Sequence, residues 1–521
     1  MFSSSKVLSV KGSTTLSKCA LRNMSTAENS VEFIVQNNAR TITLNRANKL
    51  NALNTEMCEQ IIPRLIEFSK SKSANLILIK SSSEKAFCSG GDVIQCAKNN
   101  MNDEPEKSVE FFKNEYNLNY LLSIYGKPVV SLVNGIAMGG GVGLSAHGAF
   151  RVVTESTRFA MPETSIGFFN DVGTSFFLPK LDSNLGYYLA LTGDELHGFD
   201  TLLLGFGTHY VPQSRFADLI ERLSQLELTE LSVDRRGSKL FNDRNSSQFF
   251  SLVNSAIEEF TIDVPKNHKF KYTNEQLDTI EKCFNPETHK TVADVIKSLE
   301  EDGSAFAVAT IKKLNEKSPL SVHLNWNILQ RNRNATIQES LNRELKLAAK
   351  LMTNYRNNDF NQYIKEKLIE KSSSRITSKY YKSLDSVPSS VVDELVSLDI
   401  YNPQLESTTK DDDLAQKQNV ESIIESLNAL KIDNFSKIGE HVYNFKEYPH
   451  HMGLPSQNEI KNYVTGVSAN AAEEPVTFAD AINYFRMKYD NKSGVDAKIK
   501  LVLNRKTQRN DSNPDIIEWK N

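Results

Sequence analysis

Residues 135–173, GIAMGGGVGLSAHGAFRVVTESTRFAMPETSIGFFNDVG, decide how this chain folds. An apolar run ends in the glycine triplet 139–141, and an Ala- and Ser-rich stretch typical of a helix start follows it. Two carboxylates, Glu163 and Asp171, stand eight residues apart among apolar and glycine neighbours. Glycine loops expose backbone N–H groups that stabilise an oxyanion, and carboxylates in apolar surroundings act as nucleophiles or acid–base groups. The segment therefore indicates acyl chemistry rather than a binding module.

The order of buried strand, glycine loop and helix start occurs twice, at 75–97 and again at 129–149. Apolar runs and alternation predict the strands, and 3.6-residue spacing predicts the helices. The ranges with strand character are 32–44 (two strands), 75–82, 129–138 and 150–155, those with helical spacing are 44–70 and 110–125, and KAFCSGGDV (85–93) is expected as a loop. Short buried strands that alternate with helices predict an α/β core.

Composition and charge exclude several classes of protein. The chain has 521 residues and a net charge of −3, so no basic field points to nucleic acid as a general partner. Its five cysteines form no C-x-x-C pair, which argues against a disulfide framework and a zinc site. No apolar run is long enough to span a membrane. Residues 1–28 are basic, rich in Ser and nearly free of acids, which predicts a mitochondrial transit peptide and a location in the matrix.

Five ordered motifs carry a resemblance to a known family. They are KLNALN (49–54), KAFCSGGDV (85–93), NGIAMGGGVGLSAHG (134–148), FAMPETSIGFFNDVG (159–173) and LALTGDELHGFD (189–200). In order and spacing they resemble the crotonase (enoyl-CoA hydratase/isomerase) superfamily, and most of all its 3-hydroxyisobutyryl-CoA hydrolase subgroup. The resemblance covers about residues 32–370, and the remainder is similar to the C-terminal extensions of fungal mitochondrial forms.

The resemblance implies an α/β fold: a crotonase-type spiral of repeated ββα units, a helical C-terminal region and an added C-terminal extension. The expected segments are the transit peptide 1–28, the crotonase core 30–225, a helical region 226–375 that completes the acyl-CoA hydrolase unit, a polar linker 376–420 and the extension 421–521. Within the extension, apolar spacing predicts helices at 420–432 and 478–489.

The resemblance also assigns the site residues. The amides of Gly91 and Gly140 form the oxyanion hole, Glu163 and Asp171 are the catalytic carboxylates, and Glu115 lines the substrate site together with Gly140 and both acids. Removal of one oxyanion donor typically costs about 3–4 kcal/mol of transition-state stabilisation. The same residues also fit structural roles: glycines at a tight crossing, acids as helix caps and Glu115 on a helix surface.

Three positions distinguish this chain within the family. Hydratases carry a second catalytic glutamate where this chain has Gly143, so hydrolysis by Glu163 and Asp171 is favoured over hydration of a double bond. The hydrolases usually place Pro and Gly where this chain has Asn170 and Thr174. Because proline fixes φ and glycine gives backbone freedom, these two replacements are expected to loosen the position of Asp171.

The expected activity is hydrolysis of a short β-hydroxyacyl-CoA, 3-hydroxyisobutyryl-CoA of valine breakdown above all. No metal or redox cofactor is expected, since CoA is part of the substrate. Enoyl-CoA hydration is one alternative. The other is a structural role, because similar fungal proteins are components of the mitochondrial small ribosomal subunit, which the extension would contact. Its basic stretch 498–509 could meet RNA phosphates. The oligomeric state does not follow from the sequence.

Overall fold

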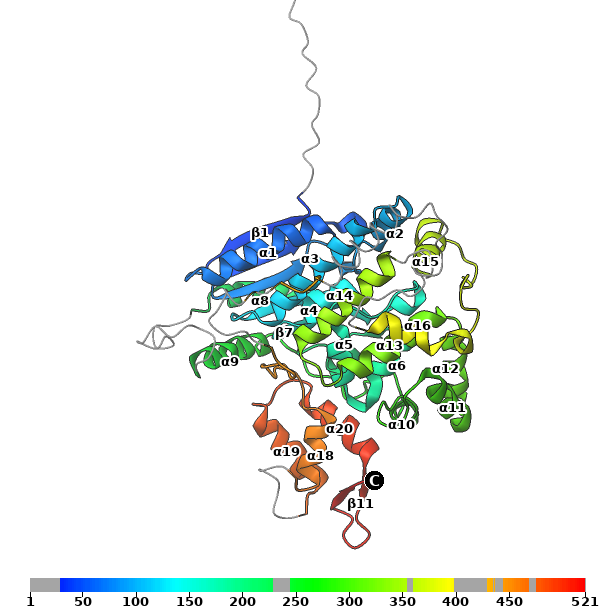
Figure 1. Ribbon diagram of the computed structural model, residues 1–521. Coiled ribbons are helices and arrows are strands. Elements are labelled where there is room, and N and C mark those ends of the chain that lie inside the picture. The colour runs from blue at the N-terminus through cyan, green and yellow to red at the C-terminus, as the bar shows by residue number, and fades with distance from the viewer. Residues whose placement is uncertain are drawn as a thin grey trace, which may run out of the picture.

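Two β-sheets surrounded by helices form the centre of the computed structural model (Figure 1). The structure describes residues 29–227, 244–353, 359–397, 429–433, 435, 444–467 and 475–520. The predicted transit peptide and most of the helix predicted at 420–432 lie outside these ranges. Within them, no helix combines the length and apolar character needed to cross a membrane.

The larger sheet has six strands, in the order β1-β2-β3-β5-β7-β10. All neighbours are parallel except β1 and β2, which form a hairpin. The strands are β1 (Val31–Gln36), β2 (Ala39–Leu44), β3 (Leu76–Ser81), β5 (Val129–Val133), β7 (Phe150–Val153) and β10 (His209–Tyr210). The apolar runs predicted at 32–44, 75–82 and 150–155 therefore form strands in the central sheet.

The smaller sheet has four strands, in the order β4-β6-β8-β9. They are β4 (Ala86–Cys88), β6 (Ile136–Met138), β8 (Arg158–Ala160) and β9 (Leu196–His197). Two predictions were wrong here. The run 129–138 is not one strand, because the chain turns at Gly135, with φ +75°, and continues in the other sheet. The backbone at Gly135 lies so close to that of Lys85 that a Cβ at Gly135 would collide with it. The segment 85–93, which was expected to be a loop, begins with strand β4.

A repeated ββα unit contributes one strand to each of the two sheets. In successive repeats the first strand joins the larger sheet and the second joins the smaller one, as in β3–β4 and β5–β6. Helices follow each pair, and the core helices are α1 (Thr55–Lys70), α2 (Val93–Met101), α3 (Pro105–Ser123), α4 (Gly140–Ala146), α5 (Thr174–Phe177), α6 (Leu185–Thr192), α7 (Phe199–Leu204), α8 (Phe216–Ser224) and α9 (Arg244–Glu258). The predicted spiral α/β core is confirmed.

A helical region follows the sheets, as predicted. Its helices are α10 (Asn274–Cys283), α11 (Val292–Asp302), α12 (Ala305–Asn315), α13 (Pro319–Asn332), α14 (Ile337–Thr353) and α15 (Phe360–Ile364). Helix α14 packs along α3, and α13 packs on α5 and α6, where the indole of Trp326 is fully buried. These contacts place α13 and α14 directly behind the segment that follows Asp171.

Residues 376–397 differ from the predicted polar linker. They contain a 3-10 turn, η9 (Leu384–Ser386), and helix α16 (Ser389–Val396), which packs on α13 and α14. Val392 and Val396 lie four residues apart, so they share one helix face and are buried there. This short amphipathic pattern was not recognised in the sequence, because polar Ser and Asp residues surround it. The rest of the predicted linker, 398–420, lies outside the described residues.

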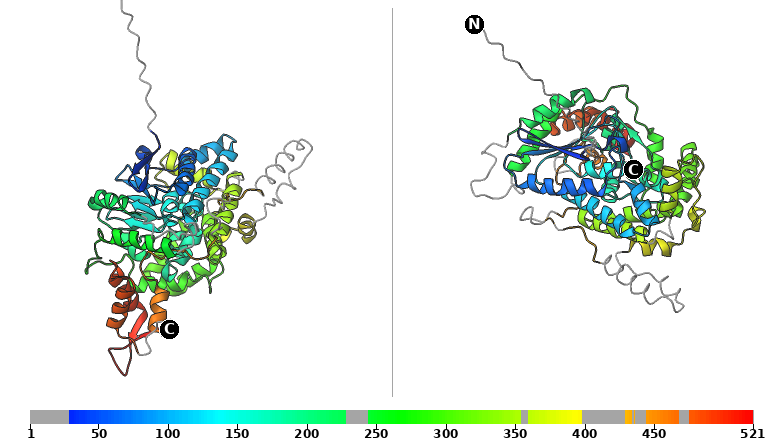
Figure 2. Two further views of the ribbon diagram at one scale, coloured as in Figure 1. Left: turned by 90° about the vertical axis from the view of Figure 1, so that its left-hand side faces the viewer. Right: turned by 90° about the horizontal axis from the view of Figure 1, so that it is seen from above.

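The C-terminal extension forms a small unit below the core (Figure 1), and the views in Figure 2 agree. It has its own apolar cluster, made by α18 (Gln457–Val464), α19 (Phe478–Lys488), α20 (Val495–Lys506) and the hairpin of β11 (Thr507–Arg509) and β12 (Ile517–Trp519). Helix α19 lies where apolar spacing predicted one, at 478–489.

Ion pairs join the extension to the core. Lys498 Nζ lies 2.8 Å from Asp182, and the buried Arg505 guanidinium lies 2.5 Å from Glu281. Lys506 shares Glu281 at 2.6 Å, and Lys500 pairs with an acid of its own helix. Most basic side chains of the 498–509 stretch therefore have partners within the protein. These partners favour a role in docking the extension over the expected contact with RNA.

Candidate active site

Three of the predicted site residues lie just beyond the carboxyl ends of neighbouring parallel strands. Gly91 follows β4, Gly140 follows β6 and Glu163 follows β8. Strands β4, β6 and β8 are hydrogen-bonded side by side in the smaller sheet, with Met138 paired to Ala160. Because parallel strands end at the same edge, their following loops meet there, which is where open α/β sheets bind ligands. The topology thus brings the glycine loops and the first carboxylate together.

The backbone at Gly91 lies close to the backbone at Gly140. A Cβ added at Gly140 would lie 3.1 Å from the Gly91 nitrogen. Leu53 hydrogen-bonds to the Gly90 carbonyl and to the Asp92 N–H, so it passes over the Gly91 amide without accepting from it. Gly140 is the first residue of α4, where backbone N–H groups have no acceptor within the helix. In the part of the chain that the structure describes, neither amide donates to another protein group. The pair has the arrangement of an oxyanion hole.

Glu163 is buried beside this pair of glycines. It opens the 3-10 turn η2 (Glu163–Ser165), and a Cβ at Gly139 would lie 2.9 Å from its Oε1. Its Oε2 accepts a hydrogen bond of 2.5 Å from Asn170 Nδ2. Burial, with the nearby charge of Asp171, raises the pKa of Glu163 to about 8. Asn170 thus holds one carboxylate oxygen and leaves the other toward the glycine loop.

Asp171 lies three residues before the start of α5 and is also buried. Its Oδ2 accepts a hydrogen bond of 2.7 Å from the hydroxyl of Tyr116, a residue of α3. Burial raises the pKa of Asp171 to about 7, and the hydrogen bond from Tyr116 opposes that rise. Two acids with raised pKa values can exchange protons near neutral pH, which suits acid–base catalysis.

Glu115 is a third buried acid at the same place. It lies on α3 with 1% of its surface exposed, so it is not an ordinary helix-surface acid. Cβ atoms added at Gly140 and Gly91 would contact its two oxygens, and Oε1 has no hydrogen-bond partner among the described residues. Burial, with the charges of Asp171 and Glu163, raises the pKa of Glu115 well above its usual range. Its protonated form can donate a hydrogen bond to a ligand beside the glycine amides.

Asn170 and Thr174 tighten the segment around Asp171, so the expected loosening was wrong. The Asn170 N–H, which a proline would lack, donates to Asn325 Oδ1 of α13 at 2.7 Å. The Thr174 hydroxyl donates to the Asp171 carbonyl at 2.6 Å. Both replacements therefore add hydrogen bonds that fix the backbone on either side of the carboxylate.

The Gly143 position has no room for the glutamate of a hydratase. A Cβ there would lie 2.6 Å from Val172 Cβ and 2.9 Å from Asn119 Nδ2. Val172 itself has φ +54°, an unusual value for a β-branched residue. The side chain of Val172 thus occupies the place of a second hydratase acid, while Asp171 enters the site from the adjacent position.

Several supporting residues were not predicted. Tyr116 holds Asp171, and Glu344 of α14 accepts hydrogen bonds from the Gly173 N–H at 2.6 Å and from Ser175. Burial raises the pKa of Glu344 to about 8. The signal for Glu344 was present, because it is an acid on the apolar face of an amphipathic helix, with Leu341 and Leu345 beside it. Tyr116 had no comparable signal.

Across the described ranges, no set of three or more His, Cys, Asp and Glu side chains has an arrangement suited to a metal ion. The expectation that the site needs neither metal nor redox cofactor stays a prediction.

Comparisons with known proteins agree with this architecture. The family model described as enoyl-CoA hydratase/isomerase matches residues 39–396. The small ribosomal subunit protein mS47 of Neurospora crassa is 33% identical over 496 residues, which cover 93% of this chain and 86% of that protein. The mitochondrial 3-hydroxyisobutyryl-CoA hydrolase of Homo sapiens is 39% identical over 338 residues, or 64% of this chain and 80% of the human protein.

Solved structures show the same fold. A carnitinyl-CoA dehydratase from Mycobacterium thermoresistibile superimposes with a TM-score of 0.58 at 27% identity, over 72% of this chain and 98% of that one. With the spiral of ββα units, the paired glycine loops and the family match over most of the chain, the conclusion is direct: this protein belongs to the enoyl-CoA hydratase/isomerase family, the crotonase superfamily.

Proposed function

We propose that this protein hydrolyses short β-hydroxyacyl-CoA thioesters, with 3-hydroxyisobutyryl-CoA as its preferred substrate. One observation carries the proposal. Glu163 and Asp171 are buried beside two glycine amides without acceptors, while Val172 fills the place of a second hydratase acid. Similarity to the human hydrolase supports this choice of substrate. Hydration of a double bond is disfavoured, since it would need the acid that Gly143 cannot provide.

In the proposed reaction the thioester carbonyl oxygen lies between the Gly91 and Gly140 amides, which stabilise its negative charge as the carbonyl is attacked. Glu163 Oε1 either attacks the carbonyl carbon, giving an anhydride that water then cleaves, or removes a proton from the attacking water. Both routes require the carboxylate form of Glu163. Since burial raises its pKa to about 8, activity should increase as the pH rises through that value.

Asp171 would complete the reaction. With a pKa of about 7, Asp171 can accept the proton released from the attacking water and pass it to the CoA thiolate once the C–S bond is broken. The Tyr116 hydroxyl fixes the direction of one Asp171 oxygen and leaves the other for this exchange or for the substrate hydroxyl. CoA leaves as the free thiol, and the acid product takes the oxygen of water.

Release of the CoA thiol from a panel of acyl-CoA substrates tests the proposal. We expect 3-hydroxyisobutyryl-CoA to be cleaved fastest, and the Glu163→Gln and Asp171→Asn variants to lose at least about 100-fold in kcat. Asp359→Asn is a matched control, because this buried acid is held by Ser318 and Ser378 and has no proposed role. A wild-type protein that releases no thiol would refute the hydrolase, and faster hydration of an enoyl-CoA would favour the alternative.

A second function is supported by a separate observation. The match to Neurospora crassa mS47 covers 93% of this chain and therefore includes the extension, whereas the human hydrolase match covers 64%. We propose on this basis a mitochondrial location, in the matrix, and an association with the mitochondrial small ribosomal subunit.

Sedimentation of the tagged full-length protein in mitochondrial extract tests this association. Comigration with small subunits would support it, and a protein that stays at the top of the gradient would refute it. The Glu163→Gln variant should sediment like the wild type, because the buried carboxylate cannot contact a partner. The two functions are compatible and are tested independently.

A further inference from the structure

Two described stretches, 429–433 and 444–448, make up the C-terminal segment, which contacts the helices that support the candidate site. The Ile432 N–H donates to Asn342 Oδ1 of α14 at 2.8 Å. The Asp433 N–H donates to Asn117 Oδ1 of α3 at 2.7 Å, and Asn117 Nδ2 donates back to the Asp433 carboxylate at 2.9 Å. Helix α3 carries Glu115 and Tyr116, and α14 carries Glu344. The segment thus links the two helices whose side chains hold the loop at Asp171.

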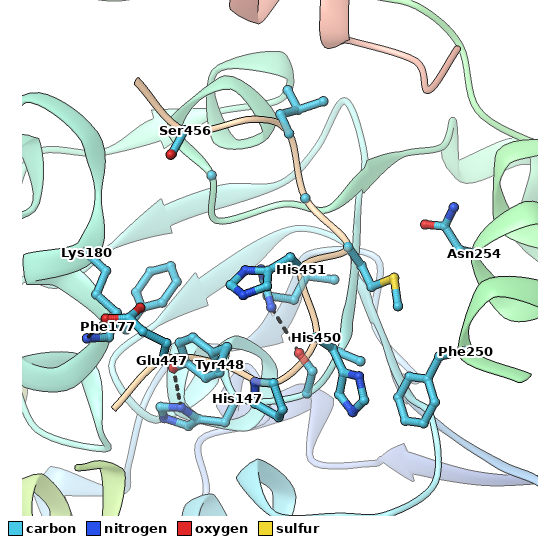
Figure 3. Close-up of a pocket in the computed structure, with 18 of the residues that line it drawn as sticks. His147, Phe177, Lys180, Phe250, Asn254, Glu447, Tyr448, His450, His451 and Ser456 are labelled. Carbon is cyan, nitrogen blue, oxygen red and sulfur yellow. Dashed lines mark hydrogen bonds and ion pairs between the residues drawn. The ribbon is translucent and has the colours of Figure 1, made fainter. Parts of the chain in front are cut away.

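The same segment reaches this loop through a histidine. The Tyr448 hydroxyl lies 2.9 Å from His147 Nδ1, as marked in Figure 3, and His147 Nε2 lies 2.7 Å from the Val172 carbonyl oxygen. A carbonyl only accepts, so Nε2 carries the proton. Burial lowers the pKa of His147 to about 4, so at neutral pH Nδ1 is an acceptor and Tyr448 donates to it. Tyr448 therefore fixes the tautomer that holds Val172.

Val172 is a sensitive point in the chain. A β-branched residue at φ +54° is strained, and it keeps this conformation only if its surroundings hold it. The His147 hydrogen bond fixes its carbonyl, and Glu344 accepts from the N–H of the same peptide group, that of Gly173. Release of the carbonyl would leave this peptide group held only through its N–H by Glu344, and relaxation of the strained Val172 would then shift the adjacent Asp171 carboxylate.

We propose that Tyr448, acting through His147, is a positioning residue for Asp171, so that the C-terminal segment is a working part of the candidate active site. The role in catalysis rests on the proposed hydrolase function. Among the described residues, His147 hydrogen-bonds to the Val172 carbonyl and to Tyr448, and Tyr448 also packs in the aromatic cluster around Phe176. Neither is placed among the groups that meet the substrate.

Kinetics of four full-length variants test the proposal. Tyr448→Phe should lower kcat about 10-fold at unchanged KM, because one hydrogen bond in the relay is lost. His147→Leu should lower kcat about 100-fold, as expected for a displaced catalytic group. His147→Gln should restore most of the activity, since its amide nitrogen replaces Nε2 as donor. Tyr489→Phe is the control: its hydroxyl donates to Glu459 at 2.6 Å within the extension, so its loss should cost stability but leave kcat unchanged.

Crystal structures of the wild type and of Tyr448→Phe and His147→Leu separate this proposal from the hydrolase assignment. The Asp171 to Tyr116 hydrogen bond, 2.7 Å here, should be lengthened or lost in both variants. An unmoved Asp171 in both would overturn the proposal, whatever the wild-type activity. If the wild type is active, equal kcat in Tyr448→Phe and wild type would also overturn it. If the wild type is inactive but Asp171 is displaced in both variants, the positioning role is upheld and only the hydrolase proposal is refuted.

Discussion

Replacement of Asn170 by Ala should change how activity depends on pH. The Asn170 side chain donates a 2.5 Å hydrogen bond to Glu163 Oε2 in a buried site, and this bond favours the ionised form of Glu163. A buried hydrogen bond to a charged group contributes about 1.5–3 kcal/mol. Since about 1.4 kcal/mol corresponds to a tenfold change in ionisation, the pKa of Glu163 should rise clearly above 8 in the variant.

The measurement is kcat/KM for thiol release as a function of pH. The rising limb of the wild-type profile is expected near the Glu163 pKa of about 8. In Asn170→Ala the limb should move to higher pH, with activity at about pH 7 reduced at least 10-fold and the difference narrowing in alkali.

Thr174→Ala is the matched control for this experiment. It removes a hydrogen bond from the other side of the loop, to the Asp171 carbonyl at 2.6 Å, and leaves the Glu163 carboxylate untouched. Its profile should fall in height without a shift of the rising limb. A limb that stays in place in Asn170→Ala, or that moves equally in Thr174→Ala, would show that Asn170 does not set the ionisation of Glu163.

Three further outcomes follow from packing and charge. Gly143→Glu should lower the melting temperature and give no hydratase activity, because its Cβ would lie 2.6 Å from that of Val172, and a stable variant that hydrates an enoyl-CoA would contradict this. The pKa of Glu344 is about 8 in the folded protein, above its unfolded value, so its contribution to stability is present at acid pH and lost as the pH rises to about 8. In urea unfolding, the free energy of unfolding of Glu344→Gln should therefore decrease less than that of the wild type as the pH rises to about 8. Parallel plots of this free energy against pH for the two proteins would contradict the prediction. Lys498→Met should leave Asp182 without its 2.8 Å partner and expose the extension to limited proteolysis, and an unchanged digestion pattern would mean that other contacts hold the extension.

The sequence was sufficient for the residues that lie at strand ends. Gly91, Gly140 and Glu163 belong to motifs in which the candidate site residue follows a short strand within three residues, and parallel strands bring such residues together. The break at Gly135 was missed, because an apolar run looks the same whether it lies in one sheet or crosses between two.

Local sequence patterns could not predict the residues that support the candidate site. Glu344 and Asn325 reach the loop at Asp171 from helices far along the chain, so their roles depend on tertiary packing. The effect of Asn170 and Thr174 was misjudged for the same reason. Backbone preference alone suggested a looser loop, but their new hydrogen-bond partners could be seen only in three dimensions.

The bond between Tyr448 and His147 joins residues 301 positions apart. During synthesis, the chain would present Glu115, Glu163 and Asp171 long before residue 448 is added and this contact can form. Folding that depends on contacts between such distant residues is slow. Intermediates are expected in which the loop at Val172 is not yet held by Tyr448 and His147. The family match ends at residue 396, so a recombinant fragment cut to that boundary would retain every carboxylate of the site and lose the contact that completes it.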